Sequence, residues 1–126
     1  MQGYTYTKGE HYPMEHLVFK VAPEDVERYL EVDHEIWTLK EAFAPGFDHI
    51  PFLYKEVWIN DNKPGEIHFI FAWESIESWR KIDQKEYQAQ LIKEFDEKFG
   101  RPYELIRVVQ NEENFGVHRV SRFERI

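Results

Sequence analysis

The chain has 126 residues, with 24 acidic and 16 basic side chains, so its formal net charge at neutral pH is −8. This length suits a single domain that buries a real core. An acidic surface gains nothing from nucleic acid or an anionic membrane, which argues against either as a partner. The absence of cysteine excludes disulfides, thiolate zinc sites and a cysteine nucleophile. No apolar run approaches the ~20 residues of a spanning helix, and the N-terminus does not resemble a secretory signal. We therefore expect a cytoplasmic protein.

The N-terminal part of the chain changes character near residue 14. Residues 1–13 are polar and show no period, which predicts a disordered or extended tail. From Glu15 the sequence alternates, with Leu17, Phe19 and Val21 on one side, as in a strand.

A first helix is predicted to begin at Pro23, because proline at the first turn sacrifices no hydrogen bond. Apolar residues recur at helical spacing from Val26 to Phe43, and Pro45-Gly46 ends the helix.

Two further strands are predicted at 52–60 and 66–73, around a turn-rich segment typical of a hairpin. Ser75 can cap a second helix, which restarts or kinks near Asp83 and ends before Gly100.

A fourth strand is predicted at 103–110, and residues 112–126 form a C-terminal extension that includes a candidate fifth strand. The order βαββαβ over residues 14–111 predicts an α+β fold of the ferredoxin-like type. In that arrangement the antiparallel strands lie in the order 4-1-3-2, with two helices on one face.

Both faces of this sheet are expected to be covered. The second and third strands carry bulky apolar residues on both sides, with Trp58 on one side and Phe69 on the other, where a sheet with one wet face would alternate cleanly. Leaving such rings wet forfeits several kcal/mol, at ~25 cal/mol per Å² of apolar surface. The helices cover one set, and we expect a second copy of the chain to cover the other and complete a dimeric α+β barrel. The alternative is a monomer in which residues 115–126 fold back over the open face.

Polar side chains interrupt the apolar pattern on the side away from the helices. They are His16, Lys20, Tyr54, Glu56, Trp58 (with its indole N–H), His68 and Arg107. An apolar cavity with a few convergent polar groups is typical of a small-ligand site. Alternatively, these groups pair with one another and only fix the register of the dimer.

No metal ion is expected within one subunit. If the first and third strands pair roughly in step, Lys20 faces His68 and His16 faces Ala72. The two histidines would then be roughly 13 Å apart at ~3.3 Å per residue, too far to share one ion.

Asp33 stands out because it falls on the apolar stripe of the first helix, as Lys40 also does on an ideal helical wheel. A buried carboxylate must be hydrogen-bonded or protonated, and its perturbed pKa suits a general base. Alternatively, Asp33 accepts a hydrogen bond from the indole of Trp37, Trp58 or Trp79 and locks the helix to the sheet.

Five short elements carry a family resemblance: Glu35-Ile36-Trp37-Thr38, Pro45-Gly46-Phe47, Lys55-Glu56-Val57-Trp58, Trp73-Glu74-Ser75 and Trp79-Arg80-Lys81-Ile82. Over roughly residues 14–110 the chain resembles an uncharacterised family within the antibiotic-biosynthesis-monooxygenase-like dimeric α+β barrels. The resemblance implies a dimeric barrel with a cavity between sheet and helices, and no single reaction. Heme-degrading members of this superfamily use a histidine on the second helix, and residues 76–99 contain none, so we expect no heme and no other cofactor.

Two functions remain open at this stage. The first is a cofactor-independent, monooxygenase-like enzyme acting on a small aromatic or apolar molecule, with Asp33 or His68 as the base and with Tyr54, Trp58 and Trp73 as walls. The second is a non-catalytic, small-ligand-binding or stress-associated dimeric module.

Overall fold

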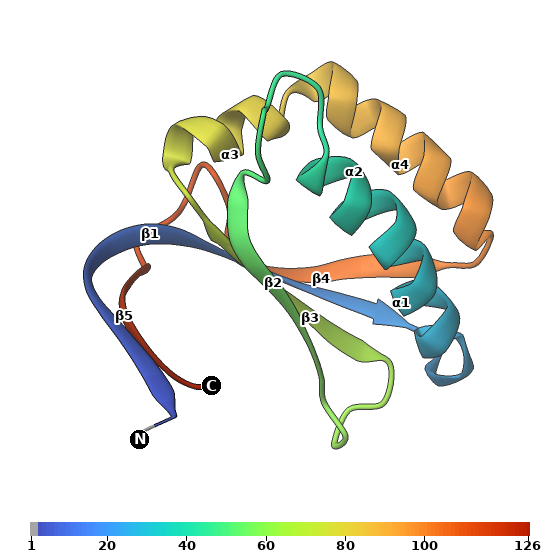
Figure 1. Ribbon diagram of the computed structural model, residues 1–126. Helices are drawn as coiled ribbons and strands as arrows, with labels where there is room; N and C mark the ends of the chain where they lie inside the picture. The colour runs from blue at the N-terminus through green and yellow to red at the C-terminus, as the bar shows by residue number, and fades with distance from the viewer. Residues whose placement is uncertain (1–2) are drawn as a thin grey trace.

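A five-stranded antiparallel sheet carries the helices on one face in the computed structural model, which describes residues 3–126 (Figure 1). The strands are β1 (Tyr4–Val21), β2 (Phe52–Ile59), β3 (Glu66–Trp73), β4 (Tyr103–Gln110) and β5 (His118–Arg125). The main sheet has the order β2-β3-β1-β4, which confirms the predicted ferredoxin-like order, and β5 pairs with β1 outside this path. Within the described residues, no helix is long and apolar enough to cross a membrane.

The first helical rod is assembled from four consecutive segments: η1 (Pro23–Asp25), α1 (Val26–Asp33), the π-helical η2 (His34–Thr38) and α2 (Leu39–Ala42). The second rod is α3 (Ile76–Ile82) followed by α4 (Lys85–Phe99). Local chemistry sets their ends. The Ser75 hydroxyl accepts a hydrogen bond from the Ser78 amide at 3.1 Å, and Gly100 adopts the left-handed conformation, at φ +65°, that ends α4.

The π-helical segment changes which side of the first rod faces the sheet. A π turn accommodates one residue more than an α turn, so positions after it are shifted by one. Lys40, seven residues after Asp33, was expected on the buried stripe, and this prediction is wrong: Lys40 is exposed and pairs with Glu94 at 3.1 Å. Glu41 instead is buried.

The core lies between the sheet and the two helical rods. One cluster surrounds Tyr29 and the α4 residues Phe95 and Phe99. The other is centred on Trp73 and Trp79, whose rings stack with centroids 5.8 Å apart. These contacts fix the helices on the sheet and leave a pocket between the two layers.

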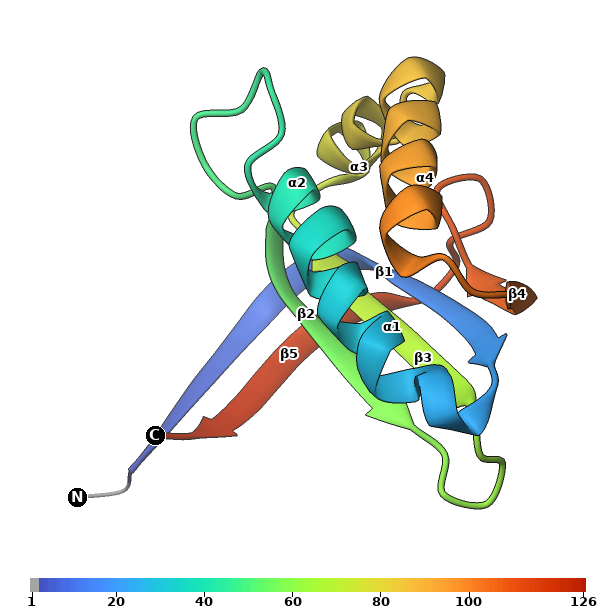
Figure 2. The same cartoon turned by 90° about the vertical axis from the view of Figure 1, so that its right-hand side faces the viewer.

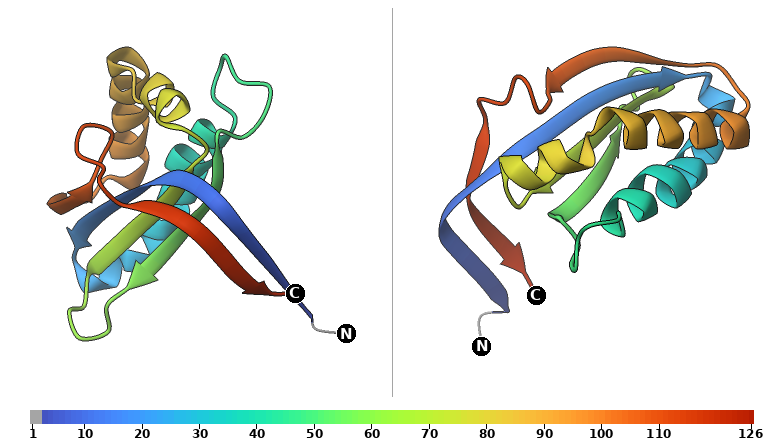
Figure 3. Two further views of the ribbon diagram at one scale, coloured as in Figure 1. Left: turned by 90° about the vertical axis from the view of Figure 1, so that its left-hand side faces the viewer. Right: turned by 90° about the horizontal axis from the view of Figure 1, so that it is seen from above.

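The N-terminal half of β1 leaves the main sheet and pairs with β5 to form a two-stranded ribbon, from Tyr4 opposite Arg125 to Pro13 opposite His118. The tip of the ribbon is formed by the pair of Tyr4 with Arg125, and the C-terminus lies there (Figure 2). The ribbon curves toward the side of the sheet that faces away from the helices, and its strands run side by side along their length (Figure 3). Residues 4–13, expected as a tail, are therefore extended and hydrogen-bonded.

The ribbon covers only a corner of the open sheet face. The guanidinium groups of Arg119 and Arg122 lie over the Tyr54 ring, at 5.4 and 4.4 Å from its centroid. Trp58, farther along β2, keeps 49% of its surface exposed. The C-terminal residues thus do not close this face.

Candidate functional site

A pocket of about 440 Å³ lies between the sheet and the helical rods. Its aromatic walls come from both layers, namely Phe19, Tyr29, Trp37, Phe69, Phe71 and Tyr103. A pocket of this size, with mostly apolar walls and a few polar groups, is typical of a site for a small organic molecule.

An ion pair lies at the centre of the polar part of this pocket. Lys55 Nζ, from β2, lies 2.5 Å from Asp33 Oδ2, and the two side chains are only 6% and 7% exposed. The partner of Asp33 is thus an ammonium group, and the alternative of an indole donor from Trp37, Trp58 or Trp79 is wrong. Lys55 Nζ also donates to Thr38 Oγ1 at 2.6 Å. Asp33 and Thr38 are five residues apart, and the π-helical turn between them brings both oxygens to the same ammonium group.

Two phenyl rings complete the surroundings of Lys55. The Nζ atom lies 5.2 Å from the ring centroids of both Phe69 and Phe71 on β3. Such cation–π contacts attract the ammonium group to the ring faces. Lys55 is therefore held in place against apolar walls.

Four further carboxyl groups line the pocket around this pair, those of Glu15, Glu41, Asp83 and Glu112. Burial raises the pKa of Glu15 and of Glu41 to about 8, and burial with the nearby Glu15 charge raises the pKa of Asp83 to about 9. Burial also raises the pKa of Asp33, although the Lys55 charge opposes this shift. The Trp73 indole donates to Glu15 Oε1 at 3.0 Å. At neutral pH the pocket thus offers three protonated acids beside one ion pair.

This arrangement supports proton transfer and the binding of an oxyanion. A carboxylate of raised pKa is a stronger base than an exposed one, and a protonated carboxylic acid can donate a hydrogen bond to a developing negative charge. The Lys55 ammonium is a second donor for such a charge. Among residues 3–126, no group of three or more histidine, aspartate or glutamate side chains is arranged to hold a metal ion.

Among the site residues predicted from the sequence, Asp33 lines the pocket. Trp73 lies beside the pocket, where its indole donates a hydrogen bond to Glu15. The other candidates lie outside the pocket lining: His16, Lys20, Tyr54, Glu56, Trp58, His68 and Arg107. Sequence reasoning missed Lys55, Glu15, Glu41 and Asp83. Lys55 and Glu15 carried a usable signal, because each interrupts the apolar alternation of its strand on the side that faces the helices.

On the open face, the predicted register of β1 and β3 is wrong by two residues. His68 pairs with Val18, and His16 pairs with Ile70, so the histidines are diagonal neighbours. Their rings are in contact, with His16 Nε2 and His68 Nδ1 2.9 Å apart, and the expected separation of roughly 13 Å is incorrect. The large predicted separation was the reason for expecting no metal ion shared by the two histidines, and this reason no longer holds.

Other polar groups on the open face pair with one another. His68 Nε2 lies 2.9 Å from Glu66 Oε1, and the Trp58 indole donates to Glu56 Oε1 at 3.1 Å. Lys20 lies opposite Glu66 in the β1–β3 register, and Arg107 lies opposite Val18 in the β1–β4 register.

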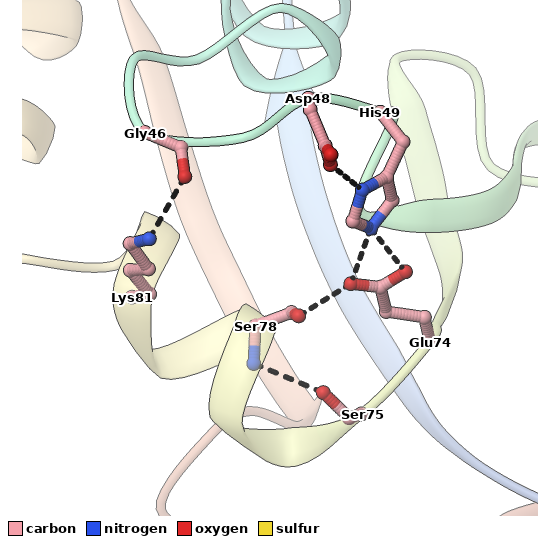
Figure 4. A network of polar contacts seen from close by, with 7 residues as sticks. All are labelled: Gly46, Asp48, His49, Glu74, Ser75, Ser78 and Lys81. Carbon is pink, nitrogen blue, oxygen red and sulfur yellow. Dashed lines mark hydrogen bonds and ion pairs between the residues drawn. The ribbon is translucent and has the colours of Figure 1, made fainter.

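A separate polar network joins the loop before β2 to the start of α3 (Figure 4). The His49 ring contacts carboxylates through both nitrogens, with Asp48 at 2.6 Å and Glu74 at 2.8 Å, and these contacts raise its pKa. The Ser78 hydroxyl donates to Glu74 at 2.5 Å. Because Ser78 contacts a carboxylate and His49 is held between two acids, this network pins the loop and does not form a serine–histidine nucleophile pair.

Comparison with known proteins identifies the fold. No family model and no curated protein matches the chain. Among solved structures, a candidate antibiotic biosynthesis monooxygenase from Caulobacter crescentus CB15 is similar at a TM-score of 0.50 and 10% identity, over 94% of this chain and 92% of that one. One from Deinococcus radiodurans gives 0.48 and 9%, over 90% and 91%. A dimeric ferredoxin-like protein from an uncultured marine organism gives 0.46 and 14%, over 94% and 90%. The chain shares its fold with the Caulobacter protein.

Proposed function

We propose that this protein binds a small aromatic or apolar molecule in the pocket between sheet and helices and oxidises it as a cofactor-independent, monooxygenase-like enzyme. The observation that carries the proposal is the buried Asp33–Lys55 pair, set among aromatic walls and protonated acids in a pocket of about 440 Å³. The candidate monooxygenase whose fold the chain shares supports the same class of reaction.

The chemistry begins with a proton transfer. Asp33 takes a proton from an acidic C–H or O–H group of the substrate, and the resulting anion is stabilised by the Lys55 ammonium and by the protonated carboxyl groups. Such an electron-rich anion can reduce dioxygen directly. For an activated methylene, the overall change is R₂CH₂ + O₂ → R₂C=O + H₂O, in which one oxygen atom enters the product and the other leaves as water.

Oxygen uptake tests this proposal. The purified protein is assayed with a panel of anthrones and dihydroxynaphthalenes, beside Asp33→Asn and a control, Lys40→Ala, whose exposed side chain lies on the same rod. We expect uptake by the wild type and by the control, and a loss of at least 100-fold in Asp33→Asn, in line with the ~10²–10⁴-fold contribution of a general base. Full activity in a folded Asp33→Asn variant would refute the role of Asp33. Ligand-induced stabilisation without oxygen uptake would favour a non-catalytic binding module.

We also propose that a second copy of the chain covers the open sheet face. Trp58 is half exposed there, and the ribbon presents Tyr6 and Phe123 at 55% and 69% exposure. A two-stranded ribbon has little stability by itself, and an exposed apolar patch of this kind usually marks an interface. The dimeric ferredoxin-like protein with a similar fold supports this assembly.

A further inference from the structure

We propose that His16 and His68 form a binding site for one divalent transition-metal ion, such as Zn²⁺ or Ni²⁺, on the sheet face opposite the pocket. This site is independent of the proposed oxidation, because its residues lie on the other face of the sheet from Asp33 and Lys55. Two ring nitrogens converge at this point, and a carboxylate lies behind one of them.

The two rings reach one point from neighbouring strands. His16 on β1 and His68 on β3 are diagonal neighbours, a relationship within the reach of long side chains on one face. Their facing nitrogens, His16 Nε2 and His68 Nδ1, are 2.9 Å apart. A metal ion at about 2.1 Å from each nitrogen spans a gap of this size with the two ligands in adjacent coordination positions.

A carboxylate fixes the protonation of one ligand. Glu66 Oε1 lies 2.9 Å from His68 Nε2, so the Nε2–H donates to this carboxylate and the lone pair of Nδ1 faces His16. A histidine that gives its second nitrogen to a carboxylate is the usual support of a metal ligand in proteins. His68 therefore has the tautomer that a metal ion requires, and a small turn of its ring moves the Nδ1 lone pair from His16 to the ion.

His16 can become the second ligand without a net release of protons. In the free protein its Nε2–H donates to His68 Nδ1; when a metal ion enters, the Nε2 proton passes to water, Nδ1 of His16 takes up a proton from water, and the Nε2 lone pair turns to the ion. Neutral imidazole is the form that binds metal.

The surroundings of the two histidines set a limit on the affinity for an ion. The His68 and Glu66 side chains are 16% and 10% exposed, and the Trp58 ring meets His16 edge-on, with centroids 6.0 Å apart. The positive charge of Arg107 opposes a cation, while the Glu66 carboxylate favours it. Water molecules, or groups of the second copy proposed to cover this face, would fill the remaining coordination positions of the ion.

The chain offers a matched control. A second histidine pair, His11 and His118, lies on the ribbon with its rings stacked at a centroid distance of 3.9 Å. This pair has no glutamate among its ring contacts in the described part of the chain. It therefore separates a built site from the general affinity of paired histidines for metal.

Calorimetric titration of the full-length protein with Zn²⁺ tests the site. We expect one ion per chain, loss of binding in His16→Ala and in His68→Ala, 10–100-fold weaker binding in Glu66→Gln, and unchanged binding in a His11→Ala/His118→Ala double variant. Shifts of the ring-nitrogen NMR signals of His16 Nε2 and His68 Nδ1 in the wild type would locate the ion even if an alanine variant failed to fold. Absence of Zn²⁺ binding, binding that survives in folded His68→Ala, or binding lost with the ribbon pair would overturn the proposal.

Discussion

Lys55 Nζ and Asp33 Oδ2 lie 2.5 Å apart in a pocket where almost all of both side chains is withdrawn from solvent. This contact joins the edge strand β2 to the first helical rod where the rod becomes π-helical. The same two groups supply the base and the cation of the proposed reaction, so the pair connects the stability of the fold with its chemistry.

We predict that substitutions of Asp33 and Lys55 have strongly coupled effects on the free energy of unfolding. Removal of one partner leaves the other charge buried and unpaired, so Lys55→Met should lower the free energy of unfolding by about 3–5 kcal/mol. The double variant Asp33→Leu/Lys55→Met should be less destabilised than the sum of the single variants, because it leaves no buried charge. Urea unfolding of the four proteins measures this coupling. Additive effects would mean that the two side chains act independently.

The raised pKa values of the acids in the pocket predict that the free energy of unfolding falls as the pH rises. Glu15 and Glu41 have folded-state pKa values near 8, above the ~4.3 of an unfolded glutamate, so the folded protein binds more protons than the unfolded chain. The stabilisation is fully present below pH 4 and is lost through pH 8, at roughly 1 kcal/mol per pH unit for each group. Thermal unfolding between pH 5 and pH 9 should show the decline, and Glu41→Gln should flatten it. A melting temperature that rises over this range would contradict the assignment.

We predict that one charged side chain, introduced on the open sheet face, disrupts the proposed dimer. Trp58→Glu should place a carboxylate in the proposed interface and convert the protein to a monomer in sedimentation at micromolar concentration. The matched control is Phe43→Ser, which removes a more exposed aromatic ring, 71% exposed, from the end of the first rod. If the wild type sediments as a monomer, or if both variants remain dimeric, the open face is not the interface.

The loop between β2 and β3 contains a glycine, Gly65, that we predict cannot be replaced without loss of stability. Gly65 has φ +94°, and a Cβ atom at this position would collide with the carbonyl oxygen of Val21. Gly65→Ala should therefore lose stability through left-handed backbone strain of about 1–2 kcal/mol and through the clash in addition. Gly116→Ala is the control, because a Cβ atom there has nothing within 4 Å and φ is not in the left-handed region. Equal melting temperatures for the two variants would refute this explanation.

The sequence predicts the elements and the faces of the sheet well, because alternation along a strand is a local property. The apolar residues at Leu17 and Phe69 face the helices, as the pattern indicated. The β1–β3 register was wrong by two residues, since a shift of two keeps every side chain on the same face and so leaves no trace in the pattern. In the predicted register the two histidines would be separated, whereas in the observed register they touch.

The site was less predictable for two physical reasons. The inserted π turn moves Glu41 inward and Lys40 outward, and a helical wheel of constant period does not show it. The Asp33–Lys55 pair joins residues 22 positions apart, so neither side chain identifies the other without the tertiary fold. Residues 4–13 were predicted as part of a tail because a projecting ribbon has no core-facing side, so its sequence shows no strict alternation of apolar and polar residues.

A crystal structure of the protein with the panel compound that stabilises it most would locate the proposed binding site. We expect the compound between the sheet and the helices, against Phe69 and Phe71, with an oxygen atom within hydrogen-bond distance of Lys55 Nζ. A compound bound instead on the open face beside Trp58 and His68, with the Asp33–Lys55 pocket unchanged, would contradict this proposal.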